Sequence, residues 1–379
     1  MALRTTHPVL GTRVLNRATL ERQLLLRPSP LGAEEAVEHL VGLQAQETKP
    51  PYHALAARLD GFRPEALSAL MESRAVARIV TLRSTVHTHT ARDAVALRRF
   101  AQPGAVDREL ALFVSRGGLA GVDLDRLAAL ARAFVEERPR TPGELRRELL
   151  GEWPGADPAS LSTAARCLLP LVQVTPRGLW GRGGRVALTT TDAWFGDAAR
   201  QDAAERDAGP DEVVPRYLRA FGPASVKDMQ TWCGLTGLRA AFERLRPRLL
   251  VFRDERGTEL FDLPDAPRPD GDTPAPPRFL PEYDNLLLSH ADRTRVLAPG
   301  TRSRTWRNNR GLRVFLLDGF LAGCWYLDEG GERTALTVEP FERPTRARRA
   351  DLAAEAERIL RITGRPGVPY EIVFRDPEG

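Results

Sequence analysis

The spacing of apolar residues in the first quarter of the chain predicts helices followed by a hairpin. Apolar residues recur every three or four positions, as they do on one face of a helix, and prolines or Asp-Gly steps close the segments. β-Branched and polar residues then alternate, as they do in strands. The predicted elements are helices at about 14–26, from 33 towards 44, at 52–59 and at 64–71, and strands at 76–80 and 85–89.

The same order recurs twice further along the chain. After linking helices at about 91–116 and 122–137, a second copy has a capped helix start at Thr141, and a third begins near Asp211. The hairpins of these copies are predicted at 171–175 with 185–188, and at 248–252 with 258–261. Helices followed by a two-stranded ribbon is the order of a winged helix. The sequence therefore predicts an α+β protein with three tandem winged-helix units, at 1–118, 119–208 and 209–264.

A different pattern follows a linker rich in Pro, Asp and Gly at about 264–277. Two apolar segments within 314–327 are joined by Asp318-Gly319, a strong hairpin signal. A strand at 335–338, a helix at about 345–363 and a last strand at 370–374 complete the pattern. We expect a β-rich, barrel-like domain over 278–379.

Composition indicates a soluble protein of several domains. The chain has 379 residues, of which 42% are hydrophobic and 28% charged, and it has no apolar run long enough to span a membrane and no signal-peptide pattern. Cys167, Cys233 and Cys324 are scattered without metal or redox spacing. We expect free, mostly buried thiols, a reducing cytoplasm and no bound metal.

The charge favours a nucleic-acid partner. The formal net charge is +5, and only two of the 55 basic residues, Lys49 and Lys227, are lysine. Arginine forks suit phosphates and base edges, although a GC-rich genome also accounts for part of this bias. The candidates for DNA contact are Arg83, His87, Arg177, Arg182, Arg185, Arg307, Asn308, Asn309 and Arg310.

The candidate reactive pair is Gln44 and Gln46, on either side of Ala45. In an extended backbone these two side chains point the same way and could hold a water or a polar ligand between them. The alternative is a polar helix terminus without a reactive role. Similarly, the glycine-rich tip at 181–185 and the segment 306–311 are either DNA-contacting loops or ordinary solvated ones.

Three neighbouring residues offer other chemistry. His87 and His89 could hold a metal from one strand face, but no cysteine or carboxylate accompanies them at ligand spacing, which favours core-facing or phosphate-contacting histidines. Glu47 could act as a base, although an extended backbone turns it away from Gln46. Lys49 could form a Schiff base with an abasic sugar.

Several motifs, taken in order, resemble those of the AlkZ-like winged-helix DNA glycosylases. They are 42–46 (Gly-Leu-Gln-Ala-Gln), Pro51-Tyr52, 81–87, 280–293 and 318–325. The resemblance implies a bacterial enzyme with three winged helices and a C-terminal β-rich domain that excises N7-alkylated purines from double-stranded DNA. In some members the substrates include bulky antibiotic adducts and interstrand crosslinks.

The resemblance also implies which residues act. The family's catalytic element is a glutamine, one residue, and then Gln or Asp, which places it at Gln44 and Gln46; other branches carry Asp or His in the motif. Tyr52 and the segment Tyr283, Asp284 and Asn285 would line the site, although the latter three residues could instead cap the last domain.

Glutamine chemistry suits such a substrate. A carboxamide takes up no proton near neutral pH, but its carbonyl can orient a water and stabilise a cationic sugar. An N7-alkylated purine is already positively charged, so it leaves without protonation. We therefore expect a monomeric, monofunctional glycosylase without a cofactor, with poor activity on neutral bases. The competing interpretations are a winged-helix transcription regulator, which would need a dimer interface and paired half-sites, and a catalytically silent damage binder.

Overall fold

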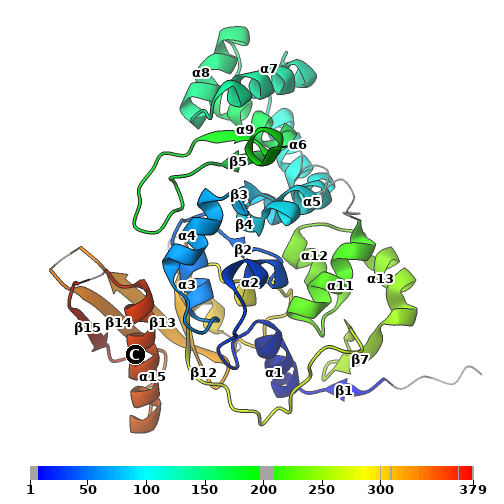
Figure 1. Ribbon diagram of the computed structural model, residues 1–379. Coiled ribbons are helices and arrows are strands. Elements are labelled where there is room, and N and C mark those ends of the chain that lie inside the picture. The colour runs from blue at the N-terminus through cyan, green and yellow to red at the C-terminus, as the bar shows by residue number, and fades with distance from the viewer. Residues whose placement is uncertain are drawn as a thin grey trace, which may run out of the picture.

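The computed structural model describes residues 7–196, 209–298, 300–307, 310–330, 332–365 and 367–377. The chain begins with four helices and a hairpin, as its periodicity predicts (Figure 1). These elements are α1 (Thr12–Arg22), α2 (Ala33–His39), α3 (Pro50–Ala56), α4 (Pro64–Glu72), β3 (Val76–Val80) and β4 (Val86–Thr90). The second helix ends at His39, well before the glutamine pair. The polar-helix-terminus interpretation of that pair is therefore wrong.

Helices followed by a hairpin recur in the two groups that the pattern predicted. The connection from the first group runs through α5 (Ala91–Ala101), a π-helical segment η2 (Gln102–Val106) and α6 (Asp107–Ser115). The second group comprises α7 (Leu124–Glu137), α8 (Pro142–Glu152), α9 (Pro158–Leu168), β5 (Leu171–Gln173) and β6 (Leu188–Thr190). The third comprises α11 (Pro210–Phe221), α12 (Val226–Cys233), α13 (Arg239–Leu245), β7 (Leu250–Asp254) and β8 (Glu259–Asp262). Thr141 caps α8 in a capping box, as expected.

The first two hairpins form one continuous sheet. Its strand order is β2-β4-β3-β5-β6, where β2 (Leu43–Gln44) is a two-residue strand at one edge. The junction is the antiparallel pair β3–β5, with Ile79 opposite Val172. The second hairpin is therefore not an independent wing. Its loop 174–187 packs back on the first group, where the Tyr52 hydroxyl donates to the carbonyl of Gly178 at 2.6 Å.

The C-terminal region contains an open sheet. Its order is β15-β14-β13-β12-β9, and in the described part of the chain β15 and β9 remain as edges, so the expected barrel is wrong. The strands are β9 (Arg278–Leu280), β12 (Val314–Leu317), β13 (Phe320–Asp328), β14 (Thr334–Pro340) and β15 (Tyr370–Phe374). Asp318 and Gly319 join β12 to β13 with φ of 49° and 79°, which confirms the predicted hairpin turn.

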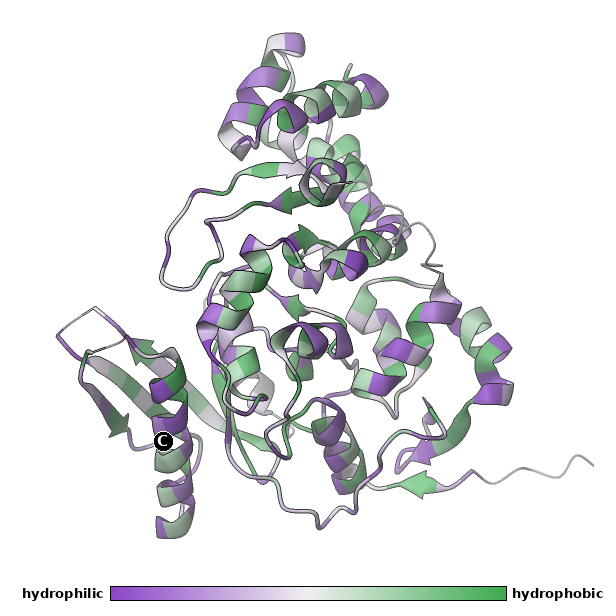
Figure 2. Cartoon of the chain, viewed as in Figure 1, coloured by the Kyte–Doolittle hydropathy of each residue, from purple (hydrophilic) through white to green (hydrophobic). Residues whose placement is uncertain are grey.

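The first helical group and the C-terminal sheet share one hydrophobic core, which includes Leu55, Trp325 and Leu352. The long helix α15 (Arg346–Thr363) contributes Leu352, Ala356 and Ile359 from one face, and Figure 2 shows hydrophilic and hydrophobic residues alternating along it. Helix α1 packs on the third group, whose hairpin also pairs with β1 (Val9–Leu10). No helix within the described ranges is long and apolar enough to cross a membrane.

Candidate functional site

Gln44 lies on β2, at the edge of the five-stranded sheet, opposite His87 of β4. The chain reaches this strand through two left-handed residues, Val41 with φ of 55° and Gly42 with φ of 91°. A Cβ on Gly42 would lie 2.2 Å from the ring of His89, so only glycine fits there without a shift. This turn explains why the helix stops early and the glutamine enters a strand.

Asn285 fixes the approach to this strand from the C-terminal region. Its amide nitrogen donates to the carbonyl of Gly42 at 2.7 Å and to that of Leu40 at 3.3 Å. Asn285 is only 8% exposed. It therefore lies behind the glutamine pair and holds the backbone next to Gln44, rather than lining an open site.

Arg83 fixes the Gln44 side chain. It lies in a tight turn, η1 (Leu82–Ser84), with φ of 55°. Its Nη2 donates to Oε1 of Gln44 at 2.8 Å and lies 3.2 Å from Nε2 of His87, while Nη1 donates to the carbonyl of Trp232. Burial lowers the pKa of Arg83 to about 10, so it remains a cation at neutral pH. Arg83 thus positions Gln44, and since Arg83 is only partly buried, its DNA contact stays a prediction.

His87 and His89 are also internal. His87 is 2% exposed, and its Nδ1 lies 2.9 Å from the carbonyl of Thr85. Because Arg83 donates to Nε2, the His87 proton is on Nδ1. Burial, reinforced by Arg83, lowers the pKa of His87 well below its usual value. The phosphate contact expected for His87 is therefore wrong. Within the described ranges, no three His, Cys, Asp or Glu side chains form a metal-binding group.

Gln46 has different surroundings from Gln44. It is exposed and lines a cavity of about 350 Å³ together with Ser84 and Thr85 of the Arg83 turn. The intervening Ala45 is held on both sides, since its N–H donates to Val86 and its carbonyl accepts from Arg78 at 2.6 Å. The two glutamines thus lie on either side of Ala45 and both approach the Arg83 turn. Gln44 is buried and held by Arg83, whereas Gln46 is open to solvent.

The other residues expected to line the site have structural contacts. Tyr52 is 1% exposed and holds the loop 174–187, so it does not line an open site. Asp284 caps α14 (Asn285–Leu288) and forms a buried ion pair with Arg58 at 2.8 Å, in agreement with the capping alternative. The hydroxyl of Tyr283 accepts from the backbone N–H of Gly311 at 3.3 Å.

The remaining candidates for DNA contact are divided by exposure. Arg177 donates to the carbonyl of Gly184 at 3.1 Å and so closes its own loop. Arg182 and Arg185 are exposed and stay predicted contacts. In the small hairpin of β10 (Trp306–Arg307) and β11 (Arg310–Gly311), Asn308 and Asn309 lie outside the described residues, as do the side chains of Arg307 and Arg310.

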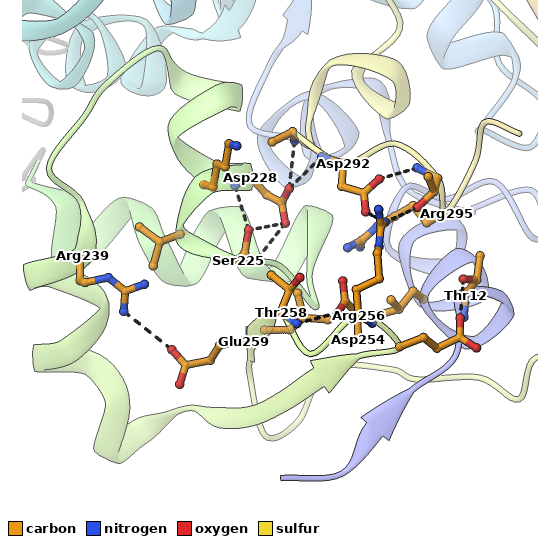
Figure 3. Close-up of a pocket in the computed structure, with 17 residues that line it drawn as sticks. Thr12, Ser225, Asp228, Arg239, Asp254, Arg256, Thr258, Glu259, Asp292 and Arg295 are labelled. Carbon is orange, nitrogen blue, oxygen red and sulfur yellow. Dashed lines mark hydrogen bonds and ion pairs between the residues drawn. The ribbon is translucent and has the colours of Figure 1, made fainter. Parts of the chain in front are cut away.

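A larger cavity lies elsewhere. It has a volume of about 750 Å³ and is lined by α1, the start of α12, β7, β8 and the segment 291–295 (Figure 3). Its charges are largely paired within the protein: Arg256 with Asp292, and Asp228 with Ser225 and the N–H of Ala291. Arg83 contacts Trp232, near the opposite end of α12. The glutamine pair therefore does not lie at the larger of these two cavities, and cavity volume alone would not have identified it.

The sequence did not identify four residues near the glutamine pair, namely Ser84, Glu109, Arg166 and Gln173. Glu109 of α6 accepts hydrogen bonds from Ser84 and from Arg166 of α9, and Gln173 of β5 lines the same cavity as Gln46. These residues belong to separate elements and have no common spacing, so only the fold brings them together.

Comparison with known proteins agrees with this architecture. The solved structure of Streptomyces sahachiroi DNA glycosylase AlkZ aligns with a TM-score of 0.77 at 20% identity, over 96% of this chain and 100% of that one, which shows a shared fold. A curated Streptomyces sahachiroi protein, "Interstrand DNA cross-link repair glycosylase", is 28% identical over 202 residues. That match spans 51% of this chain and about half, 53%, of that relative's length. The family model described as "DNA glycosylase AlkZ-like" matches residues 37–362, so the chain belongs to the AlkZ-like DNA glycosylase family.

Proposed function

We propose that the protein is a monofunctional DNA glycosylase that hydrolyses the N-glycosidic bond of cationic N7-alkylated purines in duplex DNA. The observation that carries the proposal is the arrangement of Gln44 and Gln46 around the Arg83 turn. One carboxamide is held by the partly buried guanidinium of Arg83, and the other is exposed at a cavity. Membership of the family supports assigning the reaction to this pair.

The proposed chemistry needs no general base. The electrons of the bond between C1′ and N9 remain on the purine, where they neutralise the positive charge. Water oxygen then bonds to C1′, and its proton passes to solvent. Gln46 orients this water, and the side-chain oxygen of Gln44, which accepts one hydrogen bond from Arg83, offers its second lone pair to the cationic sugar. The loss of one such group is expected to cost about 10²–10³-fold in rate.

An exposed Gln46 suits substrates that cannot leave the helix completely. A base crosslinked to the opposite strand cannot swing into a deep pocket, which is the usual route for glycosylases. Bulky adducts and interstrand crosslinks are therefore within the proposed range, in agreement with the name of the curated relative. We propose that the three helix-and-hairpin groups act as winged helices, with Arg182 and Arg185 on their DNA-contacting surface.

The surroundings of Lys49 support a glycosylase without strand cleavage. Its ammonium forms an ion pair with Glu329 and lies 6.0 Å from the ring centre of Trp180. This engagement does not favour attack on an abasic sugar. Borohydride trapping of the protein on an abasic duplex should therefore give no covalent complex.

The direct test is the release of N7-methylguanine from a duplex by wild type, Gln44→Ala and Gln46→Ala. Glu47→Gln is the matched control, because Glu47 is the exposed neighbour of Gln46 and the alternative base. Abasic sites with wild type and Glu47→Gln, together with a large loss in either glutamine variant, support the proposal. DNA binding without release by wild type would favour a regulator or a silent damage binder, and a large loss only in Glu47→Gln would move the reaction to that carboxylate.

A further inference from the structure

The cavity beside Gln46 has the size and walls of a small-molecule site. It lies between the hairpin β3–β4 and the hairpin β5–β6, and its volume of about 350 Å³ is within the usual range for ligand pockets. Half of its twelve lining residues are apolar, namely Pro142 and five aliphatic side chains. The aliphatic side chains are those of Val80, Val86, Leu171, Val186 and Leu188. None of its lining residues, all of which the structure describes, is aromatic, so it has no platform on which a flipped base would stack.

One polar atom in the wall of this cavity lacks a partner, and because the atom is buried, its carboxamide has to turn to meet a ligand. The side-chain oxygen of Gln173 is buried and accepts no hydrogen bond from the described residues. An unpaired buried acceptor is unfavourable, and a ligand that donates an N–H or O–H would remove that cost. The cavity therefore selects an aliphatic group with one hydrogen-bond donor.

The charged end of the cavity does not select for a strongly charged ligand. Glu109 accepts from Ser84 on one oxygen and from Arg166 on the other. The carboxylate and the guanidinium thus neutralise each other within the wall. A free phosphate would find no unpaired cation in this group.

We propose that the cavity receives an aliphatic substituent carried on N7 of the purine being excised, with a donor on that substituent bonding to Gln173. This inference rests on the proposed function, because it requires that the bond is broken beside Gln46. The atom N7 is separated from C1′ by only two ring atoms, so a group on N7 lies next to the reacting carbon. The cavity thereby sets which adducts the protein prefers.

The test compares duplexes carrying N7-methyl-, N7-butyl- and N7-(4-hydroxybutyl)guanine. Val186→Phe fills the cavity, and Val114→Phe is the matched control on an exposed face of α6. We expect Val186→Phe to slow release of both butyl adducts by about tenfold or more and to leave N7-methylguanine release within about twofold. Wild type should release the hydroxybutyl adduct about tenfold faster than the butyl adduct, and Gln173→Leu should abolish this difference.

The outcomes separate the two proposals. Equal losses on all three substrates, or unchanged selectivity in both variants, would overturn the substituent site and leave the glycosylase intact. Absence of N7-methylguanine release by wild type would refute the proposed function and the inference with it. Thermal melting shows whether Val186→Phe folds; if it does not, Gln173→Leu decides the outcome, because it removes an unsatisfied buried group.

Discussion

Arg83 donates a hydrogen bond of 2.8 Å from Nη2 to the side-chain oxygen of Gln44. A guanidinium has only donors, so this contact turns the carbonyl end of the carboxamide towards Arg83. Arg83 also donates to the backbone carbonyl of Trp232 in α12. The orientation of Gln44 therefore depends on how the third helical group is seated against the first.

Arg83→Lys should impair chemistry more than binding. Lysine keeps the charge but cannot contact Gln44, His87 and Trp232 at once. We expect single-turnover excision of N7-methylguanine to slow by about 100-fold, the cost of displacing a reacting group by about 1 Å. The slope of log affinity against log salt should not change, because lysine keeps the positive charge.

Arg182→Ala is the matched comparison for that measurement. Arg182 is exposed, and its guanidinium lies 4.0 Å from the carboxylate of Glu72. If Arg182 contacts a phosphate, the salt slope should fall by about 0.9. An unchanged slope in Arg182→Ala would contradict a phosphate contact for Arg182.

Gly42→Ala should destabilise the protein and displace Gln44. Alanine there is strained by the positive φ, and its Cβ would clash with the ring of His89. We expect a loss of about 3 kcal/mol or more, since a steric clash adds to backbone strain. Gly181→Ala is the control, because Gly181 has φ of 67° and no atom near its missing Cβ, and it should cost only about 1 kcal/mol. Equal shifts in melting temperature would contradict the steric explanation.

His53→Leu should make stability less sensitive to acid. His53 lies between the edges of Trp180 and Trp325, and neither ring nitrogen has a hydrogen-bond partner among the described residues. Burial lowers the pKa of His53 to about 3. The unfolded chain therefore binds a proton on this histidine below about pH 6.5, whereas the folded protein binds it only below about pH 3. The free energy of unfolding consequently falls as the pH drops from about 6.5 to about 3.

This histidine should contribute a loss of about 1.4 kcal/mol per pH unit between about 6.5 and 3. Urea unfolding at pH 7 and pH 5 measures it, and the difference between the two should shrink in His53→Leu. An unchanged difference would show that other groups, such as His89 with its pKa of about 4, account for the acid sensitivity.

Asn285→Asp should uncouple the C-terminal sheet from the glutamine strand. The substitution replaces a donor by a carboxylate that faces the carbonyls of Leu40 and Gly42. We expect a destabilisation of about 1–3 kcal/mol and a fall in excision rate. The conservative Asn285→Gln, which restores a donor, should recover part of both. Full activity in Asn285→Asp would mean that this anchor does not position Gln44.

The sequence predicts those elements whose signals are local. The capping box at Thr141, the Asp318-Gly319 turn and the helical periodicity of 345–363 all correspond to observed elements. The two-residue strand β2 carries no periodicity of its own and exists only because β4 pairs with it. The same holds for the pairing of β3 with β5, which merges two hairpins expected to be separate.

Arginine was the least predictable residue type. Its abundance indicated DNA contact, yet Arg22 and Arg58 are buried in ion pairs with Asp262 and Asp284. These carboxylates lie far along the chain, so no spacing reveals the pairs. The three cysteines were easier to predict, and all are free and buried as expected.

The shared sheet has a mechanical consequence for the way a duplex is bound. The β3–β5 pair joins the second helical group to the first through backbone hydrogen bonds, and a rotation between the groups would have to shear that pair. The strand pairing therefore opposes hinge motion between the first and second helical groups. A duplex seated across both groups must adapt its own bend and groove width to a fixed protein surface, at a cost set by its flexibility. Steps that are easily kinked, or a helix weakened by damage, would then be engaged more readily than intact, stiff DNA.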